Sequence, residues 1–525
     1  MNTSRLLNVI VAFCLAAAAA PAATFNLSTA TIADINAAMD AGALTSEKLL
    51  GLYLKRIEAF DRQGPKVNSV IAINPKALEE ARALDLERKA KGPRTALHGI
   101  PVVVKDLIDV AGMPTTAGFK PFGAPMPLRD AEVVARLRKA GAIILAKVST
   151  VNWFGNHFDE THPIGATLNP YNLAYSPGGS SNGTGAALAA NFATVGIGTD
   201  TGGSVQNPSA YCSLAGMVAT QGLISRSGIV PRGATQDRAG PMGRHVYDVA
   251  VLASYMAGWD AEDLITLRGI GHLPKGDWSR QLTAPNLKGR RLGVLREMHF
   301  TRPVDAEGLA IFERALETMR KAGAQVIDPV LTGFDLKALT SSAAGRTAEY
   351  EKLYVQNAYL ERLGPQRPFR TMQEMIDKVG REKFSDLMLA ALSLEDPATS
   401  ADYAARVRNV EMVRELIDEL IVRYQLDAFV FARNTVPPPR FESLAVQPAY
   451  PVGGSNSLSS NSGLPSVIVP AGYTANEGLP IAVQFVTKSF NDLTLLQVAY
   501  GYEQASKVRQ HPRLTPALPG ESFTY

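Results

Sequence analysis

The sequence predicts an α/β fold with a central mixed β-sheet flanked by helices. Helical and strand-like patterns alternate through the middle of the chain, which is typical of strands joined by helices that cover a sheet. Two strand-like runs near the C-terminal end, residues 465–470 and 480–486, are joined by a short polar loop and predict a hairpin on the same sheet. Hydrophobic residues make up 46% of the 525 residues and charged residues 19%, so a sizeable core is expected and wholesale disorder is not.

The alternation begins with an apolar, strand-like run at residues 100–104. Residues 130–140 then place apolar side chains at helical spacing behind an acidic start, and Gly141 is suited to end that helix. Residues 142–148 predict a buried strand. The pattern repeats with a predicted helix at residues 184–191 and a short predicted strand at residues 193–198.

Longer and more charged helical patterns follow. Helices are predicted at residues 305–322, where Gly323 can end the helix, and at residues 401–423. These patterns predict a helical insertion around residues 300–425, within a variable stretch that extends to residue 440. No linker rich in Pro or Ser separates this lobe, so residues 23–525 are expected to form one continuous domain. Asp492 is expected to cap an amphipathic closing helix at residues 492–505.

The first 22 residues have the outline of a signal peptide. Arg5 precedes a mostly apolar stretch, and small residues at positions 20 and 22 suit cleavage near Ala22. The stretch is short for a ~30 Å hydrocarbon core, and no later window is apolar for long enough, so no membrane anchor is expected after cleavage. We therefore expect a periplasmic or secreted protein. Cleavage removes Cys14 and leaves only Cys212, so no internal disulfide is expected.

The charge of the chain is close to balanced. Lys and Arg number 53 and Asp and Glu number 49, a net charge of +4, and no long basic run occurs. Nucleic acid is therefore not an expected partner. The sequence does not indicate the oligomeric state.

The composition is most unusual in two clusters of Gly, Ser and Thr, at residues 177–185 and 196–204. Tight surface turns are one interpretation, because these residue types are common there. The other interpretation is a catalytic loop. Consecutive glycines leave the backbone unobstructed, so several backbone N–H groups can converge on one negative oxygen. The candidate donors are the N–H groups of Thr201, Gly202, Gly203 and Ser204.

Three other motifs share these residues or lie near them and are less well supported. Residues 179–183 satisfy G-x-S-x-G, but the residues before them form a poor strand for an esterase elbow. The G-x-G at residues 196–198 lacks the correctly spaced glycine of a dinucleotide loop. His157 and His162 flank two acidic residues, but their spacing does not stack both imidazoles on one helical face, so no metal site is predicted.

A serine nucleophile needs a base, and none of the seven histidines has an obvious partnership with Ser204. Lys105 follows the apolar residues 100–104, whose character can exclude water from its ammonium group and lower its pKa. Lys105 is therefore a candidate base, although a lysine at a strand end is usually only solvated. The chain has no S-x-x-K motif, which argues against the penicillin-binding type of chemistry.

Several long motifs occur in order along the chain. They are His98-Gly-Ile-Pro-Val-Val-Val-Lys105, Ser176-Pro-Gly-Gly-Ser-Ser181, Gly198-Thr-Asp-Thr-Gly-Gly-Ser204 and Gly463-Leu-Pro-Ser-Val-Ile-Val-Pro-Ala-Gly472. With these motifs the chain resembles the amidase signature hydrolases over nearly its whole mature length, most weakly over residues 300–440. The resemblance implies the amidase signature fold and an enzyme that hydrolyses linear amide C–N bonds.

The resemblance also implies three catalytic residues and their roles. By motif position they are the nucleophile Ser204, the bridging Ser180, which follows a cis peptide bond, and the base Lys105; Ser181 is not the bridge. Neutral Lys105 takes a proton from Ser180, which takes one from Ser204, while the amides of residues 201–204 hold the oxyanion. This chemistry implies no cofactor.

Two further residues are candidates for substrate binding. Phe154 lies in an aromatic loop, residues 152–158, that is a candidate wall of an apolar pocket, with aromatic packing under the loop as the equal alternative. Gln206 stands where members of the family often carry Arg. Anionic substrates are therefore expected to be disfavoured, unless Gln206 points into the protein.

Two functions remain in view. The first is an exported amidase that hydrolyses a neutral, small-molecule carboxamide, with anilides, esters and carbamates as further candidates because all pass through the same tetrahedral oxyanion. The second is a non-hydrolytic amidotransferase-type subunit that works with tRNA-dependent partners. Export argues against the second function, because such partners are cytosolic.

Overall fold

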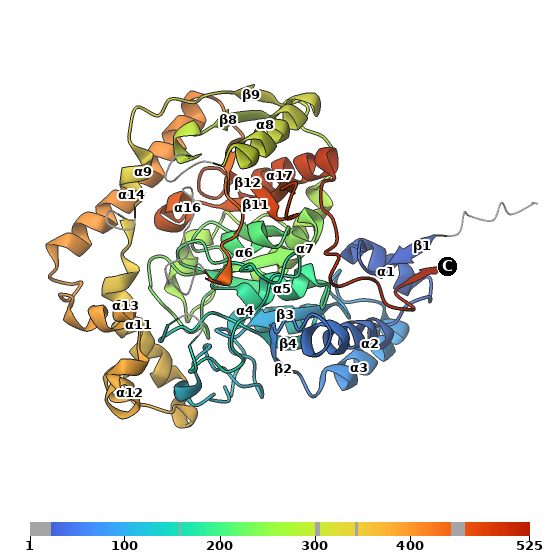
Figure 1. Ribbon diagram of the computed structural model, residues 1–525, viewed down its shortest axis with the longest axis horizontal. Helices are drawn as coiled ribbons and strands as arrows, with labels where there is room; N and C mark the ends of the chain where they lie inside the picture. Colours follow the sequence, from blue (N-terminus) through green and yellow to red (C-terminus); the bar gives the residue numbers. More distant parts are fainter. Residues whose placement is uncertain (1–22, 157–158, 300–304, 342–344, 443–456) are drawn as a thin grey trace, which may run out of the picture.

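A mixed sheet of 11 strands runs through the centre of the described chain (Figure 1). The computed structural model describes residues 23–156, 159–299, 305–341, 345–442 and 457–525. In spatial order the strands are β2 (Val70–Ile73), β4 (Ile143–Val148), β3 (Pro101–Lys105), β5 (Val195–Asp200), β7 (Arg238–Gly243), β6 (Ala215–Val218), β11 (Ser466–Tyr473), β12 (Pro480–Val486), β10 (Ala428–Ala432), β8 (Arg291–Val294) and β9 (Gln325–Ile327). Strand β3 is parallel to β4 and β5, whereas β7, β6, β11 and β12 pair antiparallel, so the predicted mixed sheet is confirmed.

The predicted alternation of helix and strand is present between residues 100 and 200. Helix α4 (Glu132–Ala140) ends at Gly141, whose φ of 96° is in the left-handed region, and β4 follows directly. Helix α5 (Asn182–Ala189) leads into β5. Strands β3, β4 and β5 are buried along their whole length, which explains why they consist mainly of apolar residues.

Helices cover both faces of the sheet at β5. A Cβ added at Gly196 would lie 2.9 Å from the side chain of Thr184, so this residue faces α5. Successive residues of a strand point to opposite faces, and Val195 accordingly lies on the side of α7 (Val246–Met256). Helices α4 and α17 (Asp492–Ser506) also contact α7, whereas α6 (Gln206–Tyr211) contacts α5.

The C-terminal hairpin and closing helix are present, but the predicted cap is wrong. Strands β11 and β12 pair antiparallel as expected. Asp492 does not cap α17, since its carboxylate accepts hydrogen bonds from the N–H of Thr220 at 2.8 Å and the hydroxyl of Thr220 at 2.6 Å. Asp492 therefore ties the closing helix to the end of β6.

The predicted helical lobe around residues 300–425 is too broad at its start. Helix α8 (Ala306–Lys321) packs on β11 and β12, and β9 forms an edge of the main sheet. The outlying helices, on the left of Figure 1, come later in the chain and are α9 (Leu336–Leu339), α11 (Ala348–Arg362), α12 (Met372–Val379), α13 (Asp386–Ala390) and α14 (Ala401–Arg423).

The N-terminal part lies on the opposite side of the molecule, with the C-terminus (Figure 1). It contains α1 (Ile32–Asp40), α2 (Ser46–Arg56) and α3 (Ala77–Lys91). Strand β1 (Thr24–Asn26) pairs antiparallel with β13 (Ser522–Thr524). The predicted signal peptide, residues 1–22, lies outside the described residues.

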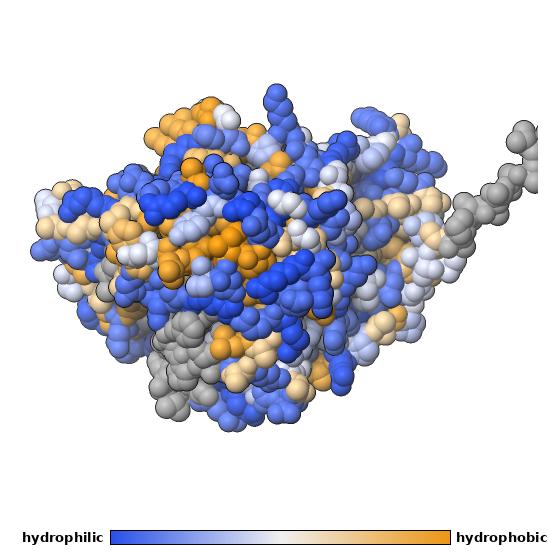
Figure 2. All heavy atoms as spheres, turned by 90° about the horizontal axis from the view of Figure 1, so that it is seen from above, coloured by the Kyte–Doolittle hydropathy of each residue, from blue (hydrophilic) through white to orange (hydrophobic). Residues whose placement is uncertain are grey.

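The surface is largely polar. The face shown in Figure 2 is mostly hydrophilic, with a hydrophobic patch near its centre. No helix in the described ranges is both long and apolar enough to cross a membrane. Cys212 is a buried, free thiol.

Candidate active site

Lys105 lies at the carboxyl end of β3, where that strand runs between its parallel neighbours β4 and β5. The side chain is fully buried. Its Nζ lies 2.6 Å from Ser180 Oγ and 2.7 Å from Thr199 Oγ1, the latter on β5. The amine is therefore held between two hydroxyls at the carboxyl ends of these parallel strands.

The surroundings of Lys105 favour the neutral amine. Burial lowers the pKa of its ammonium group well below the ordinary value, Asp200 and Asp237 oppose this effect, and the cation of Arg232 adds to it. The indole ring of Trp153 lies 5.6 Å from the Nζ atom. Lys105 is thus suited to accept a proton.

The two serines that precede α5 differ in their contacts. The peptide bond between Gly179 and Ser180 is cis, and the Ser180 hydroxyl contacts Lys105. The Ser181 hydroxyl instead bonds the backbone of Thr199, donating to its carbonyl oxygen and accepting from its N–H, both at 3.2 Å. Ser180 is therefore the serine that faces the candidate base, while Ser181 fastens α5 to β5.

Close packing brings this segment to the sheet. A Cβ at Gly183, in the first turn of α5, would lie 2.2 Å from the backbone nitrogen of Ser149, just after β4. Only glycine permits this approach. The start of α5, with Ser180 before it, consequently lies beside the ends of β4 and β5.

The loop after β5 carries Ser204 between two anchored neighbours. The buried carboxylate of Asp200 accepts the N–H of Gly203 at 3.0 Å and that of Val205 at 2.8 Å. It also accepts the hydroxyl of Ser460 at 2.9 Å. Asp200 thus fixes the backbone on both sides of Ser204.

These contacts correct one predicted oxyanion donor. The N–H of Gly203 points to Asp200, so it is not available to an oxyanion in this conformation. Within the described residues, the N–H groups of Thr201, Gly202 and Ser204 have no intramolecular acceptor. These three amides remain as candidate donors.

Ser180 and Ser204 line one cavity of about 410 Å³. The N–H of Ser181 donates to the carbonyl oxygen of Ser204 at 3.3 Å, which joins the two serine-bearing segments. In the part of the chain that the structure describes, no hydrogen bond links the hydroxyls of Ser180 and Ser204. Arg346, just before α11, and residues 385–387, at the start of α13, also line this cavity.

Phe154 does not line this cavity. Its side chain is 1% exposed and packs on the rings of Phe119 and Phe122, with ring centroids 5.7 and 5.4 Å apart. The alternative of aromatic packing is therefore correct for Phe154, and its neighbour Trp153 lines the cavity instead. Residues 157 and 158 of the same loop lie outside the described residues.

Gln206 also lies away from the cavity, and its predicted contact with substrate is wrong for this conformation. The side chain is fully buried. Its amide nitrogen donates to Ser460 Oγ at 2.9 Å and to Asp200 Oδ2 at 3.2 Å, and its carbonyl oxygen accepts from Gln484 at 2.8 Å. Gln206 points into the protein because the anchored loop turns it toward this polar network.

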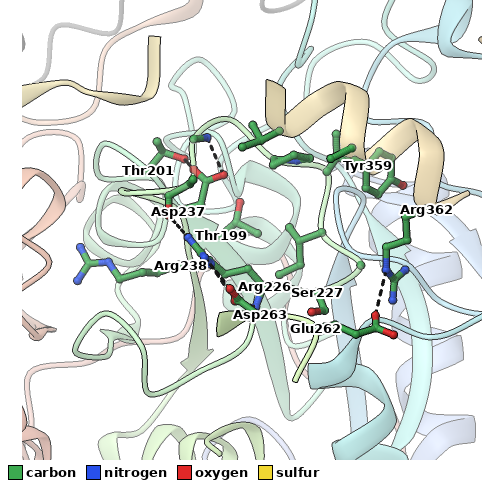
Figure 3. A pocket seen from close by; sticks show the side chains of 18 of the residues that line it. Thr199, Thr201, Arg226, Ser227, Asp237, Arg238, Glu262, Asp263, Tyr359 and Arg362 are labelled. Atoms are coloured by element: carbon green, nitrogen blue, oxygen red, sulfur yellow. Dashed lines mark hydrogen bonds and ion pairs between the residues drawn. The ribbon is translucent and has the colours of Figure 1, made fainter. Parts of the chain in front are cut away.

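A second cavity of about 240 Å³ adjoins the first and shares Trp153 and Thr201 with it. Thr199, the partner of Lys105, also borders it (Figure 3). Two ion pairs, Arg226 with Asp263 and Arg362 with Glu262, lie at its walls. Apolar side chains complete the lining, among them those of Ile229, Val230, Val355 and Ala358.

Among the described residues, no histidine lines the cavity of Ser204 and no metal site is found. His162 bonds the carbonyl oxygen of Thr150 at 2.8 Å through Nε2, and His157 lies outside the described ranges. The described residues contain no group of three or more His, Cys, Asp or Glu that could hold a metal ion.

Sequence reasoning missed four residues that shape the site: Thr199, Asp200, Arg232 and Arg346. Thr199 and Asp200 stand inside the motif that ends at Ser204, so a polar pair beside the nucleophile was a usable signal. Arg232 and Arg346 stand in no motif, and only the folded chain brings them to the cavity.

Known proteins resemble this chain along most of its length. The Amidase family model matches residues 48–496. A probable amidase of Arabidopsis thaliana is 32% identical over 93% of this chain and 92% of its own, and a glutamyl-tRNA(Gln) amidotransferase component of Halorhodospira halophila is 32% identical over 91% and 97%. The crystal structure of peptide amidase from Stenotrophomonas maltophilia, 33% identical, matches with a TM-score of 0.81 over 93% of this chain and 99% of the other.

Proposed function

The chain belongs to the amidase family, and from this membership we propose that it hydrolyses carboxamides through an acyl-enzyme on Ser204. Amide C–N hydrolysis is the activity that its family and its peptide amidase neighbour support. Ser204 acts as nucleophile, Ser180 as proton bridge and Lys105 as base.

The observation that carries this proposal is the contact of buried Lys105 with Ser180, 2.6 Å away, at the cavity that Ser204 also lines. A neutral amine is needed to draw a proton through Ser180, and burial lowers the pKa of Lys105 accordingly. Hydrogen bonds of a catalytic site often tighten only when substrate is bound, so the separated hydroxyls of Ser180 and Ser204 are compatible with this relay.

The reaction proceeds in two halves. Ser204 Oγ forms a bond to the amide carbonyl carbon while its proton passes to Ser180, whose own proton passes to Lys105. The amides of Thr201, Gly202 and Ser204 stabilise the oxyanion. The C–N bond then breaks as the proton returns to the leaving nitrogen, and water cleaves the ester by the same relay.

A carboxamide is the proposed scissile group, with anilides, esters and carbamates as further candidates. The expectation that the whole substrate is uncharged depended on Gln206, which is buried in a polar network and does not support it. The charge of the substrate has to be sought from the residues that do line the cavity.

We further propose that the enzyme is exported, on the strength of the signal peptide pattern in residues 1–22. Cleavage after Ala22 would leave β1 and its pairing with β13 intact. N-terminal sequencing of the protein from a periplasmic or culture-medium fraction should give Ala23 as the first residue. An uncleaved chain found only in the cytosol would contradict export.

The alternative function is that of an amidotransferase-type subunit. The similarity of the chain to glutamyl-tRNA(Gln) amidotransferase subunits supports this alternative. The two functions differ in what the purified chain does alone. We expect it to release ammonia or amine from small amides without tRNA, ATP or a partner, and Ser204→Ala should abolish this release. Activity that appears only with glutamine, tRNA, ATP and partner subunits would support the alternative.

A further inference from the structure

Two guanidinium groups, those of Arg232 and Arg346, line the cavity that contains Ser204. A Cβ added at Gly202 would lie 3.6 Å from Nη2 of Arg346, so this guanidinium lies beside the loop of candidate oxyanion donors. Arg232 stacks over the Trp153 ring, 5.4 Å from its centroid. Both cations are therefore near the position of a scissile carbonyl.

The positive charge of these residues is incompletely neutralised. Glu349 lies 3.2 Å from Nε of Arg346 and 3.8 Å from Nε of Arg232, and the same carboxylate is bonded by Lys352. Three cations thus share one anion. Burial and then the nearby Arg232 cation lower the pKa of Arg346, and the same two causes lower that of Lys352 to about 8.

Among the described residues, the other carboxylates near the cavity form no ion pair with Arg232 or Arg346. Asp237 accepts the hydroxyl of Thr201 and the backbone N–H groups of Arg232 and Gly233. Glu351 accepts from Thr235 and Tyr403. Asp386 lines the cavity, but it is exposed to solvent.

Hydrogen-bonding capacity is also unused. Nε of Arg232 is buried without a hydrogen-bond partner. In the described residues, the Arg346 side chain has its ion pair with Glu349 and no hydrogen bond. A buried, unpaired N–H is costly, and a guanidinium matches a carboxylate with two parallel hydrogen bonds.

We propose that Arg232 and Arg346 bind a carboxylate of the substrate, so that the preferred substrate is an amide carrying an acid group a few bonds from the scissile carbonyl. This inference rests on the proposed amide hydrolysis, whose substrate class it names. It reverses the expectation from Gln206 that anionic substrates are disfavoured.

A different role for Arg346 is direct stabilisation of the oxyanion. That role would accelerate hydrolysis of charged and uncharged amides alike, whereas carboxylate binding acts only on substrates that carry the acid. Matched substrate pairs separate the two roles.

The test compares amides that differ only in charge. Succinamate is paired with levulinamide, glutaramate with 5-oxohexanamide, and 4-acetamidobenzoate with 4-acetamidoacetophenone; each ketone replaces the carboxylate at nearly constant shape. The first two pairs place the acid on the acyl side and the third places it on the leaving group. Ammonia or amine release gives kcat/KM for each member with wild type, Arg232→Gln, Arg346→Gln and Arg346→Lys.

We expect wild type to prefer the carboxylate by at least about tenfold in one of the three pairs, since the acid gains charge-assisted hydrogen bonds. Each Gln variant should remove most of this preference, mainly through the KM of the carboxylate, because the ketone has no charge to pair. Arg232→Gln should in addition slow both members of a pair to the same degree, because loss of its cation lets the pKa of Lys105 rise. Arg346→Lys should retain part of the preference, because it keeps the charge without the fork. About 0.5 M NaCl should weaken the preference by screening.

Lys383→Gln is the matched control, because Lys383 is a partly exposed cation paired with Glu160 that does not line the cavity. It should leave every ratio unchanged. Equal rates within all three pairs, or equal loss for both members in Arg346→Gln, would overturn the proposal. If no amide is cleaved, the proposed function fails, and the anion site is then tested by thermal stabilisation with glutarate. Stabilisation of wild type that is absent in Arg346→Gln would still support the anion site. Failure of glutarate to stabilise wild type would overturn the anion site.

Discussion

The carboxylate of Asp200 accepts the backbone N–H of Gly203 at 3.0 Å. The same carboxylate accepts the N–H of Val205, so one buried acid holds the chain on both sides of Ser204. Asp200 also acts electrostatically on Lys105, whose pKa it raises against the effect of burial. One side chain therefore sets both the shape of the nucleophile loop and the proton affinity of the candidate base.

Asp200→Asn should move the acid limb of the pH profile of kcat/KM to lower pH. Removing the negative charge takes away an influence that favours the ammonium form, so the pKa of Lys105 falls further and the neutral amine persists to lower pH. The measurement is kcat/KM against pH with an uncharged amide. Asp492→Asn, a buried acid that bonds Thr220, is the control and should not move the limb. A shift to higher pH would contradict the assignment.

Lys105→Ala should remove the acid limb altogether. Only the neutral amine accepts a proton, so the wild-type rate rises with pH through the ionisation of Lys105, and the variant should lose about a hundredfold or more in rate. His162→Gln should keep the wild-type profile. If a histidine variant abolishes the same ionisation, Lys105 is not the base.

Ser204→Ala should lose most activity, by about a thousandfold or more, since it removes the attacking oxygen. Ser180→Ala should also be slowed by orders of magnitude, yet a fluorophosphonate should still label it slowly at Ser204. Peptide mass mapping identifies the labelled serine. Label on Ser181 would rule out this assignment.

Trp153 and Phe154 should respond differently to truncation. Phe154→Ala removes a buried ring from an aromatic cluster and should cost about 3–5 kcal/mol of unfolding free energy, measured by urea denaturation, with little change in KM. Trp153→Ala removes the ring beside Lys105 and Arg232 and should lower kcat/KM by at least about tenfold. A loss of kcat/KM in Phe154→Ala with little change in its stability would instead indicate that Phe154 contacts the substrate.

Gln206→Leu should destabilise the protein without changing its selectivity. The substitution leaves the side-chain N–H of Gln484 without its acceptor and removes one donor from Ser460 and one from Asp200, which keep their bond to each other, at a cost of about 1–3 kcal/mol in the free energy of unfolding. The ratio of kcat/KM for succinamate and levulinamide should stay as in wild type. A changed ratio with unchanged stability would assign Gln206 to substrate recognition.

Local patterns predicted the strands and helices that position the site, because β3, β4 and β5 are short, mainly apolar runs separated by helical patterns and glycines. Local patterns could not predict the direction in which the backbone N–H of Gly203 points. Gly203 has the conformational freedom of an oxyanion donor, but Asp200, three residues earlier, turns its amide inward. Gln206 follows the same turn into the protein.

The cavity lining formed by Arg346 and residues 385–387 could not be predicted from the sequence. Arg346 precedes α11 in a region where only helical periodicity is informative, and nothing local connects it to Gly202. Asp492 shows the same limit: its position suits a helix cap, yet its partner is Thr220, from a distant segment. Contacts between segments far apart in sequence decide the role of such residues.

Strands β1 and β13 place the first and last described residues side by side, and Ala23 and Tyr525 exchange two backbone hydrogen bonds of 2.9 and 2.8 Å. This junction lies on the side of the molecule away from the outlying helices (Figure 1). A surface linked through Tyr525 would therefore hold each molecule with its helical lobe turned outward, toward the bulk solution. In the chain that the proposed cleavage after Ala22 would leave, a short peptide joining Ala23 to Tyr525 would suit circular permutation, with new ends opened in an exposed loop.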